Sequence, residues 1–150
     1  MVHNRRITLY LLGSPGARVS DLGIPTRGGI GITVSYVPAS AVGTRLPNAA
    51  TAAPIDLLNK LVGVPVPAAA ATLVSAPHAA MLGGVPAAAA GVRYTYHGVP
   101  NLQENLVTRQ SATVVFVELD TQPSERSAGE AALQTVLGNW RWLNPAASAI

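Results

Sequence analysis

The residues that could carry out chemistry are few and scattered in this sequence. The three histidines, His3, His78 and His97, do not lie at the short spacings of metal ligands, and the chain has no cysteine. No Gly-x-Ser-x-Gly motif marks a nucleophilic serine. Glu118 and Asp120 could form an acidic pair, but a hydrated strand end is the more ordinary interpretation. We therefore predict no enzyme, no cofactor and no metal site, although acids and bases that are distant in sequence leave no motif of this kind.

A glycine-rich stretch at residues 28–31 is a second feature that could bind phosphate. It lacks the third glycine of the dinucleotide-binding pattern, and the alternation of a strand at residues 30–36 follows where a helix is needed. His78 lies among small apolar residues, and we expect it to be a buried structural histidine. Neither feature predicts a ligand site.

A row of polar and cationic side chains is the remaining candidate. Arg93, Thr95 and His97 alternate with valine and tyrosine residues. Successive side chains of a strand point to opposite faces, so these three share one face. Two interpretations stay open: contact with the phosphates of a nucleic acid, or a polar face that is merely hydrated.

The charge distribution bears on that choice. The formal net charge is +3, from nine arginines and one lysine against seven acidic residues. Arginine suits phosphate or carboxylate, although its excess over lysine can also reflect a GC-rich genome. Residues 1–110 hold eight basic and three acidic side chains, whereas residues 111–150 hold two and four. The basic surplus therefore lies in the first part of the chain.

The elements that must position these residues are clearest near the end of the chain. Residues 107–119 are rich in β-branched residues, with apolar side chains on both faces, which predicts one strand. Pro123 is tolerated in the first turn of a helix, and Gly138 is a natural helix end. The expected helix has an apolar stripe formed by Ala128, Ala132, Leu133, Val136, Leu137 and Trp140, with Arg126, Glu130 and Gln134 facing away.

The rest of the chain predicts further parts of a sheet. We expect an N-terminal hairpin within residues 5–24, a sheet over residues 28–119 with an alanine- and proline-rich middle, and a C-terminal helical region at residues 123–150. A short helix is expected at residues 54–62. Residues 98–106 predict a polar loop between two strands.

The composition indicates that much of the surface is covered by other copies of the chain. Only 11% of the 150 residues are charged and 49% are hydrophobic, whereas a soluble monomer normally carries more surface charge. The length fits one domain, residues 1–150. Residues 61–92 carry no formal charge, but prolines and glycines interrupt them and argue against a transmembrane helix. We expect one self-associating α+β domain and no membrane partner.

Several segments, in their order and separation, resemble the coat proteins of single-stranded RNA bacteriophages, the leviviruses. The resemblance covers residues 91–146 well and residues 5–37 loosely, and residues 38–90 have no counterpart. The segments are RYTYH at residues 93–97, VTRQ at 107–110, the strand at 111–119, the turn Ser124-Glu125-Arg126, the alanine- and leucine-rich helix, and LNPA at 143–146.

The resemblance implies an antiparallel sheet with an N-terminal hairpin and C-terminal helices packed over a dimer partner. Dimers of this kind assemble into an icosahedral shell, the virion, in the cytoplasm of a bacterial host. The helix stripe would pack on the partner as well as on its own sheet, in an interface of roughly 2,000 Å² or more. The residues expected at this dimer interface are Ala132, Leu133, Val136, Leu137 and Trp140.

The resemblance also implies that the inward sheet face binds viral single-stranded RNA, including a hairpin that serves as packaging signal and translational repressor. Thr95 and His97 match contact positions of the family, Arg93 lies on the same face, and Arg109 completes the expected RNA-binding set. The predicted loop at residues 98–106 matches the family's hairpin loop around the symmetry axes. Its expected assembly residues are Pro100, Asn101, Gln103 and Asn105.

Three other classes of protein stay open. A head-tail or decoration protein of a tailed phage would also be apolar, cysteine-free and prone to assemble. A small-ligand-binding β-barrel would be a monomer with a closed sheet and no nucleic acid. An enzyme is the least favoured class, because the sequence has no catalytic motif.

Overall fold

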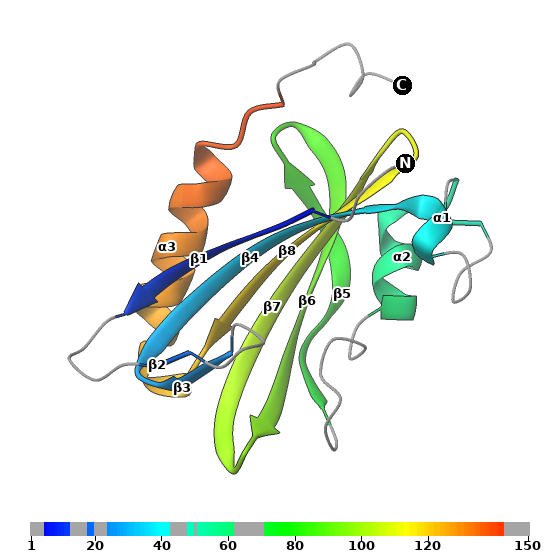
Figure 1. The fold of residues 1–150 in the computed structure, drawn as a ribbon. Helices are drawn as coiled ribbons and strands as arrows, with labels where there is room; N and C mark the ends of the chain where they lie inside the picture. Colours follow the sequence, from blue (N-terminus) through cyan, green and yellow to red (C-terminus); the bar gives the residue numbers. More distant parts are fainter. Residues whose placement is uncertain are drawn as a thin grey trace.

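The computed structural model describes residues 5–12, 18–19, 24–42, 48–49, 51–61 and 71–142. In these residues an antiparallel sheet carries one long helix on one face and two shorter helices on the other (Figure 1). The strands are β1 (Arg5–Leu12), β2 (Arg18–Val19), β3 (Pro25–Arg27), β4 (Gly29–Pro38), β5 (Thr72–Leu82), β6 (Val85–Tyr96), β7 (Val99–Gln110) and β8 (Thr113–Thr121). The helices are α1 (Ala39–Val42), α2 (Pro54–Leu61), the 3-10 turn η1 (Pro123–Glu125) and α3 (Arg126–Gly138).

The main sheet has six strands in the order β1-β4-β8-β7-β6-β5, and every neighbouring pair is antiparallel. After β4 the chain passes through α1 and α2 to β5 at the far edge (Figure 1). It then returns strand by strand until β8 pairs with β4. The last strand in the chain therefore lies inside the sheet, between β4 and β7.

The predicted α+β class, with an antiparallel sheet and a C-terminal helix, is confirmed. β4 follows the predicted alternation, since Ile30, Ile32 and Val34 are buried against α3. α2 and α3 also begin at or near the predicted residues, because Pro54 and Pro123 stand where only a helix start tolerates them. Period and proline position were sufficient signals for these elements.

Two predictions around β7 are wrong. The expected single strand at residues 107–119 is broken by a tight turn, in which Ser111 has a positive φ of 52°. The expected polar loop at residues 98–106 belongs to β7, which starts directly after the turn at His97 and Gly98. Two of the polar side chains that suggested a loop, Gln103 and Asn105, form hydrogen bonds inside the fold instead, so their polarity misled the prediction.

The N-terminal strand also has a different partner from the predicted one. β1 pairs with β4 along its whole length, with Arg5 opposite Tyr36 and Leu12 opposite Gly29. β2 pairs with β3, not with β1. The hairpin predicted within residues 5–24 is therefore wrong, since the strand that pairs with β1 is β4. The ten residues of β4 offer a longer ladder than the two residues of β2.

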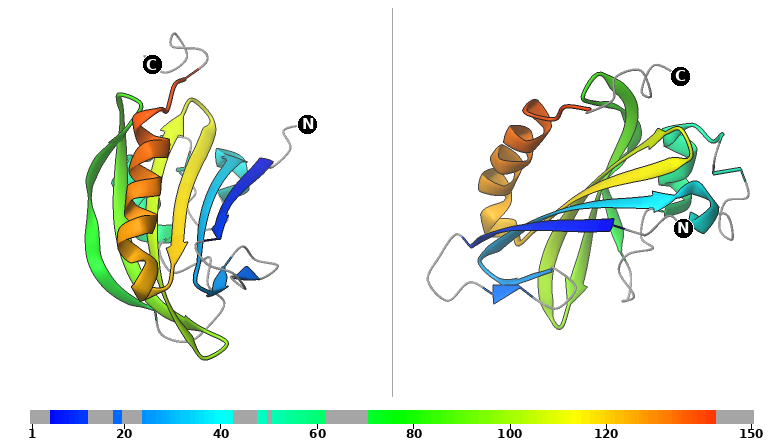
Figure 2. Two further views of the ribbon diagram at one scale, coloured as in Figure 1. Left: turned by 90° about the vertical axis from the view of Figure 1, so that its left-hand side faces the viewer. Right: turned by 45° about the horizontal axis from the view of Figure 1, so that its top comes forward.

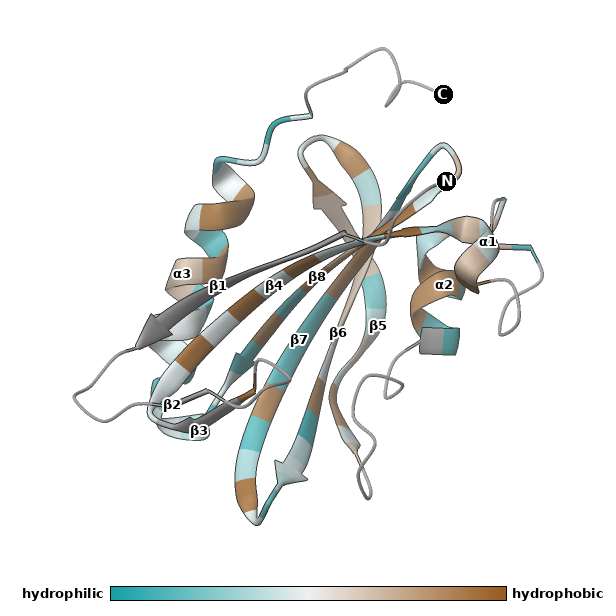
Figure 3. Ribbon diagram, viewed as in Figure 1, coloured by the Kyte–Doolittle hydropathy of each residue, from teal (hydrophilic) through white to brown (hydrophobic). Residues whose placement is uncertain are grey.

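Hydrophobic layers cover both faces of the sheet. On one face Leu133 of α3 packs with strand residues such as Ile32 and Val117. On the other face Leu57 and Leu58 of α2 are fully buried against β6, β7 and β8. Figure 2 shows α3 and α2 on opposite sides of the curved sheet, and Figure 3 shows the apolar bands along β4, β8 and α3.

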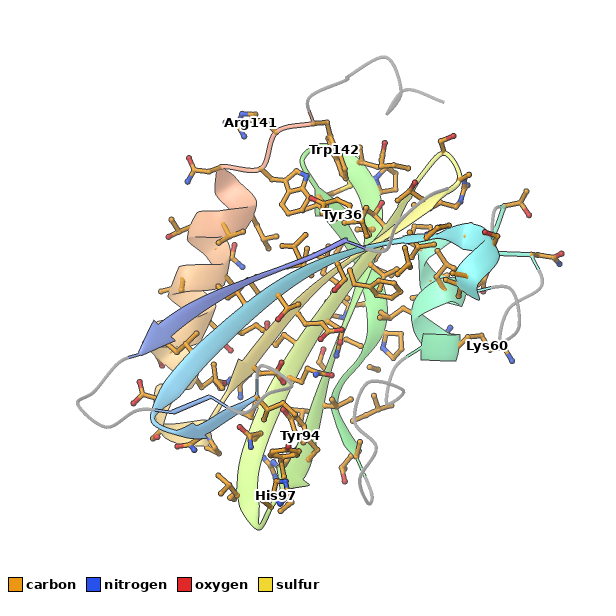
Figure 4. The ribbon with its side chains drawn as sticks, in the orientation of Figure 1. Tyr36, Lys60, Tyr94, His97, Arg141 and Trp142 are labelled. Carbon is orange, nitrogen blue, oxygen red and sulfur yellow. The ribbon has the colours of Figure 1, made fainter. Side chains whose placement is uncertain are left out.

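The chain beyond α3 is fastened to the β5–β6 turn. The Trp142 indole Nε1 donates a hydrogen bond to the Leu82 carbonyl oxygen at 3.1 Å, and the Trp140 and Trp142 rings meet edge to face at 5.5 Å. Gly83 lies beneath them, because a Cβ there would stand 2.8 Å from both indoles. Figure 4 shows Trp142 near Tyr36, at the end of the sheet opposite Tyr94 and His97.

Candidate ligand pocket between the sheet and the C-terminal helix

A pocket of about 610 Å³ lies between the sheet and α3. Its walls come from β5, β6, β7, one residue of β8 and one side of α3. The apolar part of the wall is formed by Val74, Met81, Leu106, Val117, Leu133 and Leu137. The volume falls within the range of small-molecule sites, which is about 300–1,000 Å³.

The pocket exists because α3 covers only part of this face. Gly129 is buried against β8, since a Cβ there would collide with Thr121 and lie 3.3 Å from Leu119. Leu133, one turn later, is 5% exposed and belongs to the core. This close approach holds α3 over β8 and β4, and the pocket lies beside it, against β5, β6 and β7.

Three titratable side chains line the pocket, which are His78, Glu104 and Arg126. Glu130 lies beside them on α3. The Arg126 Nε donates a hydrogen bond to Glu130 Oε1 at 2.7 Å. The carboxyl group of Glu104, on β7, is in hydrogen-bond contact with that of Glu130, on α3. Gly91, on β6, lies opposite Glu104 and has no side chain that could cover the glutamate.

The tautomer of His78 follows from one contact. Its Nδ1 lies 2.8 Å from the carbonyl oxygen of Ala76. A carbonyl oxygen can only accept, so Nδ1 carries the hydrogen. His78 was predicted to be a buried structural residue, and this prediction is wrong: it is exposed on β5 and lines the pocket.

The environment separates the pKa values of the two glutamates. Burial raises the pKa of Glu104, and the neighbouring Glu130 raises it further, while Arg126 and His78 act in the opposite direction. The hydrogen bond from Arg126 lowers the pKa of Glu130, and the same bond raises the pKa of Arg126. The two pKa values therefore shift in opposite directions, and Glu104 keeps its proton to a higher pH than Glu130.

The arrangement is suited to binding. The walls supply apolar surface, and the polar groups are gathered at one end, which fixes the orientation of a ligand. Among the residues that the structure describes, no group of His, Asp and Glu side chains is placed to hold a metal ion. None of the described helices has the length and apolar character needed to span a bilayer.

The predicted RNA-binding residues do not share one face. Arg93 and Thr95 are exposed on β6, on the α3 side of the sheet, and His97 is exposed in the adjoining turn. Arg109 is half-buried on the opposite face, where its Nε donates to the Ala52 carbonyl oxygen at 3.3 Å. Arg93 and Thr95 therefore share a face, whereas His97 lies beyond the end of β6 and its ring meets Tyr96 edge to face. RNA binding by the four residues stays a prediction.

The predicted assembly residues lie in a strand and are mostly buried. Asn101, Gln103 and Asn105 are buried in β7, whereas Pro100 is exposed. A buried asparagine or glutamine cannot contact a neighbouring shell subunit, so the exposed assembly loop expected from these residues is wrong.

A hydrogen-bonded network explains why two of these polar side chains, Gln103 and Asn105, are buried. Asp120 Oδ1 accepts from the Tyr94 hydroxyl at 2.6 Å and from Gln103 Nε2 at 3.1 Å. Asn105 Nδ2 in turn donates to Gln103 Oε1 at 3.1 Å. Burial and the neighbouring Asp120 raise the pKa of the Tyr94 hydroxyl. Asp120 is 4% exposed, so the hydrated strand end predicted there is wrong.

The residues predicted for a dimer interface pack against their own sheet. Leu133 is buried in the core on the α3 face. The other four are partly buried against the same cluster, and they are Ala132, Val136, Leu137 and Trp140. The stripe therefore has an intramolecular partner, and its packing on a second copy stays a prediction.

The polar end of the pocket was not predicted from the sequence. The spacing of Arg126 and Glu130 is the one local signal, because residues four apart on a helix are neighbours. These two were expected to face away from the sheet, yet Glu130 reaches Glu104. No sequence pattern connects Glu104 with α3, because tertiary packing alone brings them together.

Comparisons with known proteins identify the fold. No protein-family model and no curated protein matches the chain. A solved protein of unknown function from Pseudomonas aeruginosa, PA94, has a TM-score of 0.68 and 14% identity over 96% of this chain and 87% of its own. LpqN, involved in cell envelope biogenesis of Mycobacterium tuberculosis, has a TM-score of 0.44 and 16% identity over 92% of this chain and 90% of its own. The first likeness shows a shared fold and no more.

Proposed function

We propose that this protein binds a small molecule with an apolar body in the pocket between the sheet and α3, without catalysis. The pocket of about 610 Å³ is the observation that carries the proposal. A cleft of this size with apolar walls and a few convergent polar groups is the usual form of a ligand site. Of the classes considered from the sequence, this one is nearest to the small-ligand-binding protein, with an open sheet in place of a barrel.

The packing on either side of the pocket supports the proposal. Gly129 holds α3 against β8, and Trp142 ties the end of the helix region to the β5–β6 turn. Both wall elements are therefore anchored outside the pocket. A preformed site needs less ordering of the protein when a ligand binds, which favours affinity.

Displacement of a neutral fluorescent probe tests this function. We expect N-phenyl-1-naphthylamine to bind saturably with increased emission, and apolar competitors to displace it. Ala89 lines the pocket and is half-buried, so Ala89→Phe should fill the site and weaken probe binding by about tenfold or more. Ala131→Phe adds the same ring at an exposed position of α3 and should leave binding unchanged. Equal binding to both variants would contradict the proposal.

A second candidate is the coat function implied by the sequence resemblance, and one observation favours self-association. β5 is an edge strand on which Leu73, Val74 and Met81 are 53%, 45% and 58% exposed. Residues 71–82 contain no Asp, Glu, Lys or Arg. An uncharged apolar edge has nothing to repel the same edge of a second copy, with which it can continue the sheet.

Sedimentation and electron microscopy of the protein expressed alone test this second candidate. Closed uniform particles that contain nucleic acid would support a coat function. Met81→Lys should then shift the population toward the monomer, because a lysine on an edge strand opposes pairing. Ala131→Lys is the control with the same charge on α3. A wild-type protein that stays monomeric at all concentrations would exclude this function.

A further inference from the structure

The pocket is elongated along α3, and its length restricts the ligand more than its volume does. On the helix side its lining runs from Arg126 to Gly138, which is about 18 Å. On the sheet side β5 lines it from Val74 to Met81, which is about 20 Å. The volume of about 610 Å³, distributed over about 18 Å, corresponds to a mean width of about 6–7 Å. The pocket is therefore much longer than it is wide.

Charged side chains line one end of the pocket. Glu104 of β7 lies opposite Gly91 of β6, and Gly91 lies opposite Ser75 of β5. Arg126, the first residue of α3, acts electrostatically on Glu104 and lies at the same end. Hydrogen-bond donors and acceptors are both available there, so this end suits the polar group of a ligand.

The opposite end of the pocket is apolar and is bounded by aromatic side chains. Ala80 of β5 and Leu137 of α3 line the pocket there and pack, together with Trp140 and Trp142, against the core cluster on the α3 face. The Trp142 indole is fixed beyond Ala80 by its hydrogen bond to the Leu82 carbonyl oxygen. This end therefore suits a terminal methyl group.

The wall between the two ends is aliphatic. Valine, leucine, alanine and methionine residues supply its apolar surface, and no described lining residue is Phe, Tyr or Trp. Aromatic ligands gain affinity from packing on aromatic rings, and this wall offers no such ring apart from the His78 imidazole. The register of β5 against β6 shifts between Leu73 and Ser75 and again between Ser75 and His78, which bends the strand. A flexible chain can follow a bent wall better than a rigid ring system can.

We propose that this pocket binds the single unbranched alkyl chain of an amphiphile, with the terminal methyl between Ala80 and Leu137 and the polar group beside Glu104. The inference rests on the proposed ligand-binding function and names the class of ligand. An extended chain advances about 1.25 Å per carbon, because C–C bonds of about 1.5 Å form a zigzag, so about fourteen carbons fill the length. The chain is about 4 Å wide, so the pocket admits one chain and not the paired chains of a bilayer lipid.

A series of n-alkylphosphocholines tests the length of the pocket. Each is measured below its critical micelle concentration, by displacement of N-phenyl-1-naphthylamine. From octyl to tetradecyl we expect the displacing concentration to fall by about threefold to fourfold per methylene, because each added CH₂ is buried. From tetradecyl to hexadecyl it should change little, since the added carbons remain outside the pocket.

Two isomeric alcohols test the shape of the chain. 1-Dodecanol and 2-butyl-1-octanol have the same composition and the same hydroxyl group, and they differ in branching. The branched isomer should displace the probe at a concentration about tenfold higher or more, because a pocket that is one chain wide cannot bury both of its branches.

Two variants at the apolar end should move the limiting chain length in opposite directions. Ala80→Leu adds carbons inside the pocket and should shorten the limiting chain by about two carbons or more. Leu137→Ala removes part of the wall and should lengthen it, which tests the inference independently if Ala80→Leu does not fold. Ala79→Leu adds the same side chain at the exposed neighbouring position, outside the pocket, and should keep the wild-type limit.

The outcomes separate the two proposals. A displacing concentration that falls evenly through hexadecyl, equal displacement by the two alcohols, or a limit that neither variant moves would overturn the chain inference and leave the apolar ligand site in place. Diacyl phosphatidylcholine found by mass spectrometry on protein recovered from vesicles would overturn the restriction to one chain. Absence of saturable binding by the probe and by every alkyl ligand would overturn the proposed function itself, and the inference with it.

Discussion

Glu104 of β7 and Glu130 of α3 bring two carboxyl groups into hydrogen-bond contact across the boundary between sheet and helix. Two carboxylates at such a distance repel each other, so one of them keeps a proton to a higher pH than usual. Burial raises the pKa of Glu104, so this residue keeps the proton, while the hydrogen bond from Arg126 lowers the pKa of Glu130. The helix and the sheet are therefore joined by a contact that titrates.

This contact predicts that stability decreases as the pH rises through the folded-state pKa of Glu104. The raised pKa means that protonation favours the folded state, so the contribution is complete below the unfolded pKa of about 4.3 and is lost above the folded one. Thermal unfolding between about pH 4 and pH 8 should show the decrease. Glu104→Gln, which resembles the protonated form, should reduce this decrease of stability with pH, and Glu125→Gln should leave it unchanged.

The pKa shift of Glu130 has the opposite sign from that of Glu104. Its pKa is lowered, so its contribution is present above the unfolded pKa and is lost as the pH falls through the folded one. The two glutamates therefore act in different pH ranges. A Glu104→Gln protein with the full wild-type decrease toward high pH would show that another group is responsible.

The close approach of α3 predicts a large effect of one methyl group at Gly129. Gly129→Ala should destabilise the protein by about 1–3 kcal/mol, because the added Cβ collides with Thr121 on β8 and forces the helix outward. Gly138→Ala is the matched control, since a Cβ there meets nothing within 4 Å and alanine favours a helix. Chemical denaturation of both variants measures the difference, and equal stability would contradict the packing described for α3.

The β5–β6 turn predicts a second pair of glycine variants with different outcomes. Gly83→Ala combines a φ of +57° with a Cβ 2.8 Å from both indoles, so we expect a loss of about 1–3 kcal/mol and a shift in tryptophan emission as the rings move. Gly84→Ala has a φ of +81° but nothing within 4 Å. It should cost only about 1 kcal/mol, from its backbone conformation, and leave the emission unchanged.

The buried network on the other face predicts an unequal effect of two tyrosines in the same strand. Tyr94→Phe removes the 2.6 Å hydrogen bond to Asp120 in a buried position and should cost about 1.5–3 kcal/mol. Tyr96→Phe, two residues later and half-buried, should change the free energy of unfolding by less than about 1 kcal/mol. Urea denaturation provides the comparison; similar losses would mean that the network contributes little.

Part of the fold could be predicted because local signals and tertiary structure agree. Ile30, Ile32 and Val34 alternate along β4 and pack toward α3, and Pro123 stands at a helix start. β7 could not be predicted, because Gln103 and Asn105 are polar and yet buried. Their partner Asp120 lies on the next strand, so only the paired strands satisfy them.

The candidate site depended even more on tertiary structure. His78 has small apolar neighbours in sequence and reads as a core residue, but β5 is an edge strand and exposes it. Glu104 is one acid in a polar segment, and its raised pKa arises from burial and from Glu130 on a different element. A sequence pattern reports residues that are close along the chain, whereas this site is formed by residues that are distant in sequence and close only in the fold.

The central position of β8 has a consequence for how the chain acquires its structure during synthesis. β1 and β4 can pair as soon as they leave the ribosome, but the strand that flanks β4 on its inner side is the last one made. Until residues 113–121 emerge, one long side of β4 has no partner and its apolar face has no α3 to cover it. The early half of the protein is therefore exposed to mispairing for most of translation, and completion of β8 joins both halves in one late cooperative step.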